Sequence, residues 1–354
     1  MEICYLDYFS CTAWELFFDP CILTIIVNET NNNIRRKVGN PNMSEKNLKN
    51  NYLHETDEIE IRALLGLLYL RGCLNQTKHD VHHLFGLDGH QGFGATMSVN
   101  RFQFLLARLS FDDKLQRDRR WKTDRFSAIR DIFEQLNTNC AKYMAPEAYS
   151  ALDETLTPTR VRSAFVQYNP RKPARYGILF RSINAITFRY THSVIVMAGK
   201  PENTEDAHYY IPTVMESVKV LVRHLEKYQE LDGRTISTDQ FYTGFPLTEW
   251  LLSHNIMTVG TIQKNRAAIP VEFKDTTGRE NNSYQIIWEK ENKIISAHSY
   301  VVKTKSKGKK NVLMLSSRPP QNGKVLVCKE STVCWQKQKS VSNLGFGNLF
   351  ERFI

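Results

Sequence analysis

Apolar residues recur at helical spacing through the first third of the chain. The runs 59–70 and 99–109 have this pattern, and Ser98 stands where the N-cap of the second helix belongs. A third helix is predicted from Phe126 to about Tyr143. The apolar residues of the run 59–70 are dense enough to predict a helix that is buried on most of its circumference.

From about Tyr149 the pattern changes to β-rich runs separated by polar breaks. A helix is predicted after Thr213, which forms a capping box with Glu216, and another over 246–254. Strands are predicted from Tyr149 to the turn at Thr157-Pro158 and over 176–188, 193–198, 234–238 and 256–262. Early strands joined by short links and later strands joined by helices are typical of an α/β fold with a mixed sheet.

Short antiparallel strands are predicted between Tyr284 and Ser317, as a small β-rich region. Beyond Gly323 the pattern weakens, and no fold is predicted there.

The net charge of +10 favours an anionic partner, most simply nucleic acid, although most of the excess lies after residue 280. The seven cysteines are scattered without a CxxC pair, which favours a reducing compartment over disulfides or a paired-cysteine zinc site. The uncharged run 20–27 is too short to cross a bilayer, so no membrane partner and an intracellular protein are expected.

Two carboxylates carry the candidate chemistry. Asp153 lies near the middle of a predicted buried strand, where an acid is costly unless it is paired or metal-bound, and Asp239 follows a strand at its carboxyl end. Two such acids on adjacent strands are what Mg²⁺ needs to act on a phosphodiester. The alternative for Asp153 is a strand-end residue that caps the following turn.

The segment between Thr155 and Lys200 contains no acidic residue and many basic ones, with aromatic residues interleaved. This composition suits a surface that receives a phosphate backbone, and an ordinary solvated basic face is the alternative. The lysine run from Lys303 to Lys310 leaves three interpretations open, namely a solvated hairpin turn, a DNA contact or a nuclear localisation patch. The histidines at 79, 82 and 83 suit a solvated loop or helix cap better than a metal site.

The motifs around both aspartates resemble those of piggyBac-type DDE transposases. The first comprises Leu152-Asp153-Glu154 followed by residues 168–177, Tyr-Asn-Pro-Arg-Lys-Pro-Ala-Arg-Tyr-Gly, and the second is the run 238–243, Thr-Asp-Gln-Phe-Tyr-Thr. The runs 65–69, 97–102, 259–262 and 313–317 continue the match, so the resemblance covers roughly residues 15–320.

The resemblance implies an RNase H-like mixed-sheet core with helices, preceded by a helical region and carrying a small β-rich insertion. It divides the chain into a helical dimerisation and DNA-binding region at 1–145, a catalytic core at 146–270, the insertion at 271–320, and a poorly ordered tail at 321–354. It also implies a nuclear protein that acts on double-stranded DNA at transposon ends and TTAA targets, with a homodimer left open.

By the same resemblance, Asp153 and Asp239 would be catalytic ligands of Mg²⁺. The basic residues that would contact DNA are Arg160, Arg162, Arg171, Lys172, Arg175, Lys264 and Arg266.

The sequence departs from the family pattern after Ser317. The family's third catalytic aspartate follows the insertion, whereas this sequence has no aspartate after Asp275. We therefore expect a DNA-binding protein of transposase origin, with strand cleavage and transfer lost or strongly impaired. The alternatives are a domesticated, non-enzymatic DNA- or protein-binding protein, and an active nuclease in which a glutamate of the tail substitutes.

Overall fold

The chain forms two compact units. The first comprises Met1–Tyr143, Pro158–Ile178 and Val196–Tyr210, and the second Met144–Thr157, Leu179–Ile195 and Ile211–Ile354. The computed structural model describes residues 13–40, 50–159, 163–170, 172–204, 206–266, 268–289, 294–304, 308–318 and the backbone of 335–338. The division after Tyr143 lies close to the predicted one at 145. However, two segments that the sequence assigned to the core, 158–178 and 196–210, belong to the helical unit.

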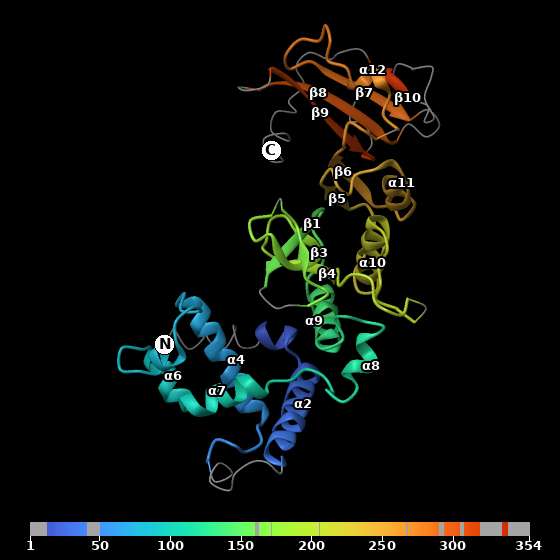
Figure 1. Cartoon of the computed structure of the whole chain (residues 1–354). Helices are drawn as coiled ribbons and strands as arrows, with labels where there is room; N and C mark the ends of the chain where they lie inside the picture. The colour runs from blue at the N-terminus through green and yellow to red at the C-terminus, as the bar shows by residue number, and fades with distance from the viewer. Residues whose placement is uncertain are drawn as a thin grey trace. The chain divides into compact units, whose positions relative to one another are not determined.

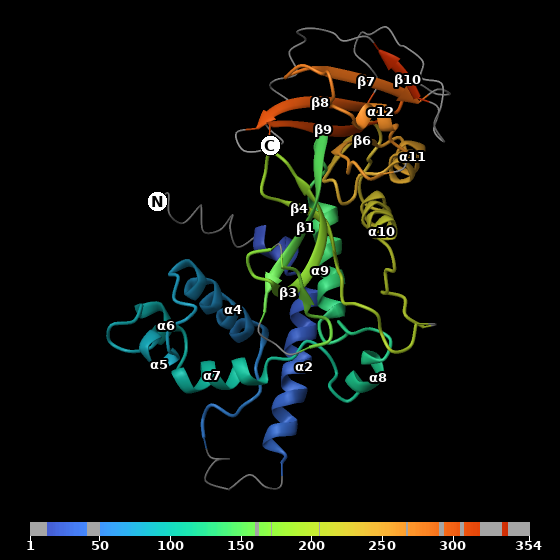
Figure 2. The same ribbon diagram turned by 45° about the horizontal axis from the view of Figure 1, so that its top comes forward.

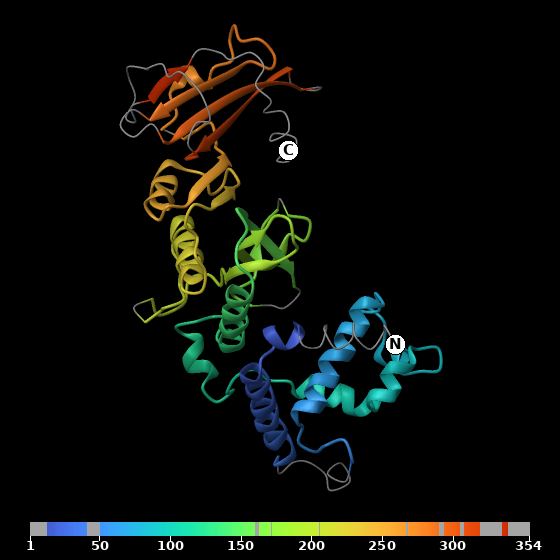
Figure 3. The same cartoon turned by 180° about the vertical axis from the view of Figure 1, so that it is seen from behind.

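The first unit is built of helices, drawn from blue to green in Figure 1 and from behind in Figure 3. Its described helices are α2 (Pro20–Val38), α4 (Glu58–Cys73), α5 (Val81–Leu84), α6 (Gln91–Thr96), α7 (Val99–Arg108), α8 (Arg117–Trp121) and α9 (Arg130–Tyr143). Asp57 and Ser98 accept hydrogen bonds from the first turns of α4 and α7, so the predicted Ser98 cap is confirmed.

Helix α4 is buried along one stripe only. Ile61, Leu64 and Leu67 face the core, whereas Ile59 is 78% exposed, so the prediction of burial around most of the circumference was wrong. The apolar residues of α2 and α4 are shared between two apolar cores, and α7 contributes Phe102 and Leu105 to one of them. Each helix thus buries one apolar face. Helix α9 begins four residues after the predicted start at Phe126.

The second unit holds a mixed sheet. Its strands are β1 (Tyr149–Pro158), β3 (Tyr176–Ala185), β4 (Thr191–Val196), β5 (Thr235–Thr238), β6 (Met257–Thr261), β7 (Tyr284–Glu289), β8 (Ser296–Thr304), β9 (Gly308–Ser316) and β10 (Trp335–Gln338). The order is β10-β7-β8-β9-β6-β5-β1-β3-β2, and β4 pairs with β3. Strand β2 (Gln167–Tyr168) and the start of β3, Tyr176–Ile178, belong to the first unit. Strands β1, β5 and β6 are parallel, while β9 runs antiparallel to β6. The predicted mixed α/β architecture is therefore confirmed.

Helices precede β5 and β6, and the helix between these two parallel neighbours is the connection that parallel pairing requires. Helix α10 (Val214–Glu226) joins β4 to β5, and α11 (Phe245–Ser253) joins β5 to β6 and packs on β6. Thr213 caps α10 as predicted, but the carboxylate of Glu216 pairs with Lys219 at 2.7 Å.

The predicted β-rich insertion is a run of antiparallel strands that continues the same sheet, and Figure 2 shows β7, β8 and β9 side by side. Its own apolar core includes Phe273 of the short helix α12 (Val271–Lys274) and Ile287. Within the predicted tail, the backbone of β10 pairs with β7, a strand that the sequence pattern did not reveal. Among the described helices, none is long and apolar enough to span a membrane.

One of the buried ion pairs of the first unit joins α7 to α4. The side chain of Arg101 is 5% exposed, and its guanidinium binds both carboxylate oxygens of Glu60, at 2.7 and 2.5 Å. It also donates to the carbonyl oxygens of Tyr52, His54 and Glu55, which fixes the segment before α4. Burial raises the pKa of Glu60, but the hydrogen bonds from Arg101 and Thr56 outweigh it and leave the pKa lowered.

We predict that Arg101→Leu lowers the free energy of unfolding by about 3–5 kcal/mol, because it leaves a partly buried carboxylate and three carbonyl groups without their donor. Urea denaturation followed by circular dichroism measures the change. Arg35→Leu is the control, since it breaks an exposed ion pair with Glu55 and should leave the midpoint unchanged. Equal midpoints for the Arg101 variant and the wild type would contradict this account.

Candidate functional site

The parallel register of β1 and β5 places Asp153 and Asp239 side by side. Leu152 pairs with Thr238 as the last partners of the two strands, and each aspartate is the next residue along its chain. Neighbouring strands lie about 4.8 Å apart, and equivalent positions of parallel strands point to the same face. The two carboxylates are therefore neighbours at one edge of the sheet, within the second unit.

Both aspartates are exposed, which corrects the expectation that Asp153 would be buried. Ser150 and Leu152 are buried on one face of β1, so alternation along the strand turns Asp153 to the other face. Asp153 accepts a hydrogen bond from the N–H of Glu154 at 2.7 Å, and Asp239 accepts one from the N–H of Gln240 at 2.5 Å. None of the described lysines and arginines forms an ion pair with either aspartate.

A pair of threonine hydroxyls holds the chain that follows Asp239. The hydroxyl of Thr243 lies 2.8 Å from that of Thr238 and donates to the carbonyl oxygen of Asp239 at 2.9 Å. The same carbonyl accepts the N–H groups of Tyr242 and Thr243. The turn 239–243 is thereby closed over the end of β5, and the position of the Asp239 backbone is fixed.

Gly260 of β6 is required by this turn. It pairs with Thr238, and a Cβ atom at Gly260 would overlap the carbonyl oxygen of Thr238 and the hydroxyls of Thr238 and Thr243. Because one of these atoms belongs to the backbone, side-chain rotation cannot relieve the overlap. The sequence carried the signal, since a glycine inside a strand marks close approach of another segment, but we did not predict this role.

Arg181 of β3 links the two elements that carry the aspartates. Its side chain is 8% exposed, and its Nε lies 3.9 Å from Oε2 of Glu154, the residue after Asp153. Its Nη1 donates to the hydroxyl of Ser217 on α10 at 2.9 Å. The guanidinium also lies 5.4 and 5.8 Å from the ring centroids of Phe241 and Tyr242. The prediction that the basic residues of 155–200 form a surface for phosphates is thus wrong for Arg181, which is buried.

The pKa of the Tyr242 phenol depends on the charges around the site. Burial raises its pKa above the ordinary range, Arg181 opposes this shift, and the carboxylates of Glu154, Asp153 and Asp239 add to it. The hydroxyl is buried and has no hydrogen-bond partner among the described residues. Three carboxylates therefore raise the pKa of this buried hydroxyl, and the buried guanidinium of Arg181 opposes them.

The donor set fits a hard divalent cation. Mg²⁺ is commonly held by one or two carboxylates, with waters and substrate phosphates completing its shell. Asp153 and Asp239 supply two adjacent, exposed carboxylates that are not paired with a cation of the described chain. Across the described residues there is no cluster of three or more histidine, cysteine, aspartate or glutamate side chains that would form a site from protein ligands alone.

The predicted DNA-contacting residues fall into three groups. Lys264 and Arg266 are exposed on the loop after β6, which leaves the sheet at the edge where the aspartates lie. Lys172 and Arg175 lie in the first unit, on the turn between β2 (Gln167–Tyr168) and β3. Arg160, Arg162 and Arg171 lie outside the described residues.

Two other features that the sequence singled out lie on the surface, and neither adds to the candidate site. The histidines at 79, 82 and 83 are exposed around α5, whose N-cap is Asp80. Lys303 of β8 is opposite Lys309 of β9, so the described part of the lysine run lies on a hairpin. Lys305 and Lys307 lie outside the described residues.

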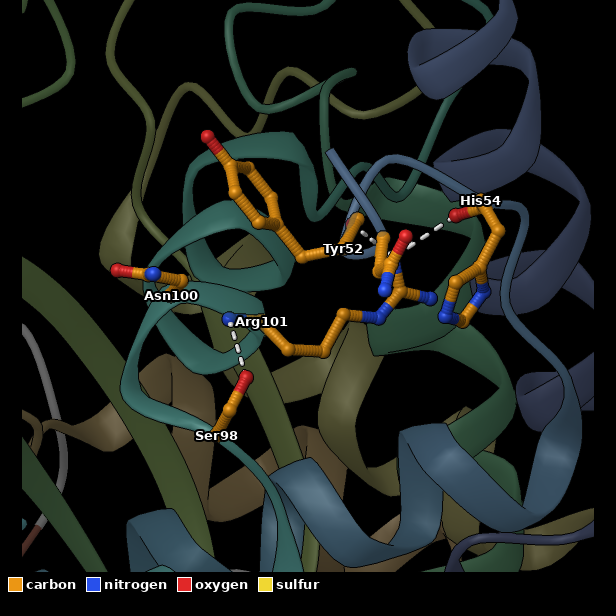
Figure 4. Close-up of a pocket in the computed structure, with 6 residues that line it drawn as sticks. Tyr52, His54, Ser98, Asn100 and Arg101 are labelled. Carbon is orange, nitrogen blue, oxygen red and sulfur yellow. Dashed lines mark hydrogen bonds between the residues drawn. The ribbon is translucent and has the colours of Figure 1, made fainter. Parts of the chain in front are cut away.

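One polar hollow of about 370 Å³ lies in the first unit, at the start of α7 (Figure 4). It is lined by Asn51, Tyr52, His54, Ser98, Asn100 and Arg101. The arginine is committed to the ion pair with Glu60, and Ser98 caps the helix. Two of the side chains that line the hollow are thus engaged in holding the helical unit together.

The sheet order β4-β3-β1-β5-β6, with an acid directly after the last paired residue of each of the adjacent parallel strands β1 and β5, defines an RNase H-like core. The comparisons with known proteins agree with this class. A DDE transposase family model, described as Transposase IS4, matches residues 10–343. The chain belongs to this family, in its piggyBac-type branch.

Relatives of known sequence and structure support the assignment. The human PiggyBac transposable element-derived protein 3 is 25% identical over 225 residues, which are 60% of this chain and 35% of that protein. The human PiggyBac transposable element-derived protein 2 is 26% identical over 165 residues, 46% of this chain and 25% of that protein. A piggyBac transposase, solved in a synaptic complex with hairpin DNA, has a TM-score of 0.76 and 26% identity, over 88% of this chain and 61% of that one. The chain thus spans about a third or less of the length of these human relatives.

We predict that Gly260→Ala lowers the free energy of unfolding of the second unit by about 1–3 kcal/mol, because the added methyl group displaces the turn 239–243. Gly66→Ala on α4 is the control. It adds the same group in open space within a helix, and should raise stability by about 0.5–1 kcal/mol. Urea denaturation of both variants measures the difference, and a stabilising Gly260→Ala would refute the role given to this glycine.

Proposed function

We propose that this protein binds DNA through a piggyBac-type transposase core, and that Asp153 and Asp239 hold Mg²⁺ at the DNA. The observation that carries the proposal is the register that makes these two exposed carboxylates neighbours. Lys264 and Arg266, exposed beyond the same edge of the sheet, supply positive charge where a phosphate backbone would approach. The piggyBac transposase that resembles this chain was solved with hairpin DNA, which supports DNA as the ligand.

The roles of the protein groups follow from their placement. Asp153 and Asp239 would bind the ion, and a bound Mg²⁺ would activate a water or a 3′-hydroxyl and stabilise the charge that develops on a phosphodiester. The Thr238–Thr243 pair fixes the Asp239 backbone, and Arg181 holds the residues that flank both aspartates. The resemblance supports TTAA-containing duplexes as targets, a homodimer as the assembly and the nucleus as the location.

We expect the 354-residue polypeptide alone to bind DNA but to cleave its strands slowly. The family chemistry uses three carboxylates, and no aspartate follows Asp275 in this sequence. Since positioning supplies much of the rate of phosphoryl transfer, two ligands should leave cleavage orders of magnitude slower. A second candidate function is DNA binding without catalysis, which the matches to human transposable element-derived proteins favour.

A titration of a TTAA-containing duplex, followed by fluorescence anisotropy, tests the proposal. We expect Mg²⁺ to tighten binding by the wild type, because the ion bridges the carboxylates and a phosphate. Asp153→Asn and Asp239→Asn should abolish this Mg²⁺ effect while leaving Mg²⁺-free binding intact or slightly tighter. An unchanged Mg²⁺ effect in both variants would overturn the metal site, and the lack of any DNA binding at low salt would overturn the function.

A gel assay of the same duplex decides between impaired and absent catalysis. Cleavage that is rapid in the 354-residue polypeptide and lost in Asp153→Asn would refute the claim that this activity is impaired. Slow, Asp153-dependent nicking supports a residual enzyme, and binding without nicking supports the non-catalytic alternative.

We also predict that substituting both Lys264 and Arg266 with alanine reduces the slope of log affinity against log salt by about 2, because each cation releases roughly one counterion from a phosphate. The control is Lys227→Ala, which removes an exposed cation at the end of α10 and should leave the slope unchanged. An unchanged slope in the double variant would show that the loop after β6 does not contact the backbone.

A further inference from the structure

Two tyrosines form an exposed pair on the β2–β3 hairpin of the first unit. Tyr168 and Tyr176 are direct partners in the antiparallel register, and their ring centroids lie 4.8 Å apart with a 40° angle between the planes. Each residue remains more than half exposed, at 56% and 58%. Cross-strand aromatic pairs stabilise a hairpin, but pairing alone leaves much of each ring in water.

The turn between the tyrosines carries an exposed, positively charged residue, Arg175, whose backbone is strained. Arg175 has a φ of 47°, in the left-handed region that disfavours residues other than glycine and asparagine. Hydrogen bonds hold it there, because its N–H donates to the Lys172 carbonyl oxygen at 3.1 Å and its own carbonyl oxygen accepts the Asn169 N–H at 2.6 Å. Such strain clusters at functional positions, and here it carries an exposed arginine rather than the glycine that the backbone favours.

No acidic residue stands near this turn in the sequence, since the chain has none between Thr155 and Lys200. Within the described residues, Arg175 forms no ion pair with a carboxylate. The hairpin thus combines two exposed aromatic rings with cationic side chains one residue or a few residues away. This is the chemistry of proteins that bind single-stranded nucleic acid, where bases stack on aromatic rings and cations follow the backbone.

We propose that this hairpin is a binding site for unpaired DNA nucleotides. A base stacks on the Tyr168–Tyr176 pair, while Arg175 and Lys172 bind the adjoining phosphates. The inference rests on the proposed DNA-binding function and adds its preference for strand ends and unpaired segments. Unpaired DNA is the favoured form, because the base faces of an intact duplex are already covered by their neighbours.

The test compares a 12-nucleotide single strand with a blunt duplex of the same sequence, by anisotropy with the full chain. Replacing both tyrosines with leucine should weaken binding of the single strand roughly tenfold and that of the duplex less than twofold. Replacing both with phenylalanine keeps the ring faces and should preserve single-strand binding. Phe188→Leu, which changes a 60% exposed ring beside Arg189, is the matched control and should have no effect.

Arg175→Gly separates function from folding. It relieves the left-handed strain, so the melting temperature should stay the same or rise, while affinity for both DNA forms should fall. A merely structural arginine would give the first result without the second. An affinity that is unchanged in this variant would remove Arg175 from the site.

A direct signal of stacking does not depend on the stability of the variants. A 2-aminopurine base in the single strand should be quenched on binding to the wild type and to the phenylalanine variant. The inference is overturned if the leucine variant binds the single strand as tightly as the wild type, loses both DNA forms equally, or quenches 2-aminopurine as strongly. If the wild type binds the duplex without binding the single strand, the proposed function stands and this inference fails. If it binds neither, the proposed function has failed first.

Discussion

The candidate site depends on the parallel pairing of β1 with β5. That pairing makes Asp153 and Asp239 neighbours, at a separation set by the sheet itself. Two carboxylates at this distance repel one another, but both are exposed, so water reduces the repulsion to the order of 1 kcal/mol. The fold can therefore hold the pair without a metal, and a divalent cation would turn a mild repulsion into two favourable contacts.

The surrounding structure restricts each member of the pair separately. Thr243 closes the turn after Asp239 through hydrogen bonds to backbone and side chain, and Gly260 leaves the space in which this turn lies. On the other side, the buried Arg181 contacts Glu154, next to Asp153, and the rings of Phe241 and Tyr242, shortly after Asp239. Among the described residues, Arg181 thus contacts the neighbours of the two aspartates and forms no ion pair with either, which leaves their oxygens available to a ligand.

Local patterns in the sequence predicted most of the secondary structure and the position of both aspartates. Ser98 and Thr213 were identified as caps because capping depends on residues within one turn. The exposure of Asp153 was missed because its apolar neighbour Leu152 suggested a buried strand, although alternation places the two side chains on opposite faces. The burial of Arg181 was missed for a different reason: its partners Glu154, Ser217 and Phe241 lie 27 or more residues away, and a charge count cannot show burial. Strand β10 follows a long segment without clear periodicity, so no local signal marked it.

A crystal structure of the chain grown with Mn²⁺, which replaces Mg²⁺ and scatters anomalously, tests the metal site most directly. We expect an anomalous peak bridging the carboxylates of Asp153 and Asp239, with the turn 239–243 unchanged, and no peak there in Asp239→Asn. Ordered Mn²⁺ elsewhere with none between these two residues, or carboxylates that point away from one another, would contradict this expectation.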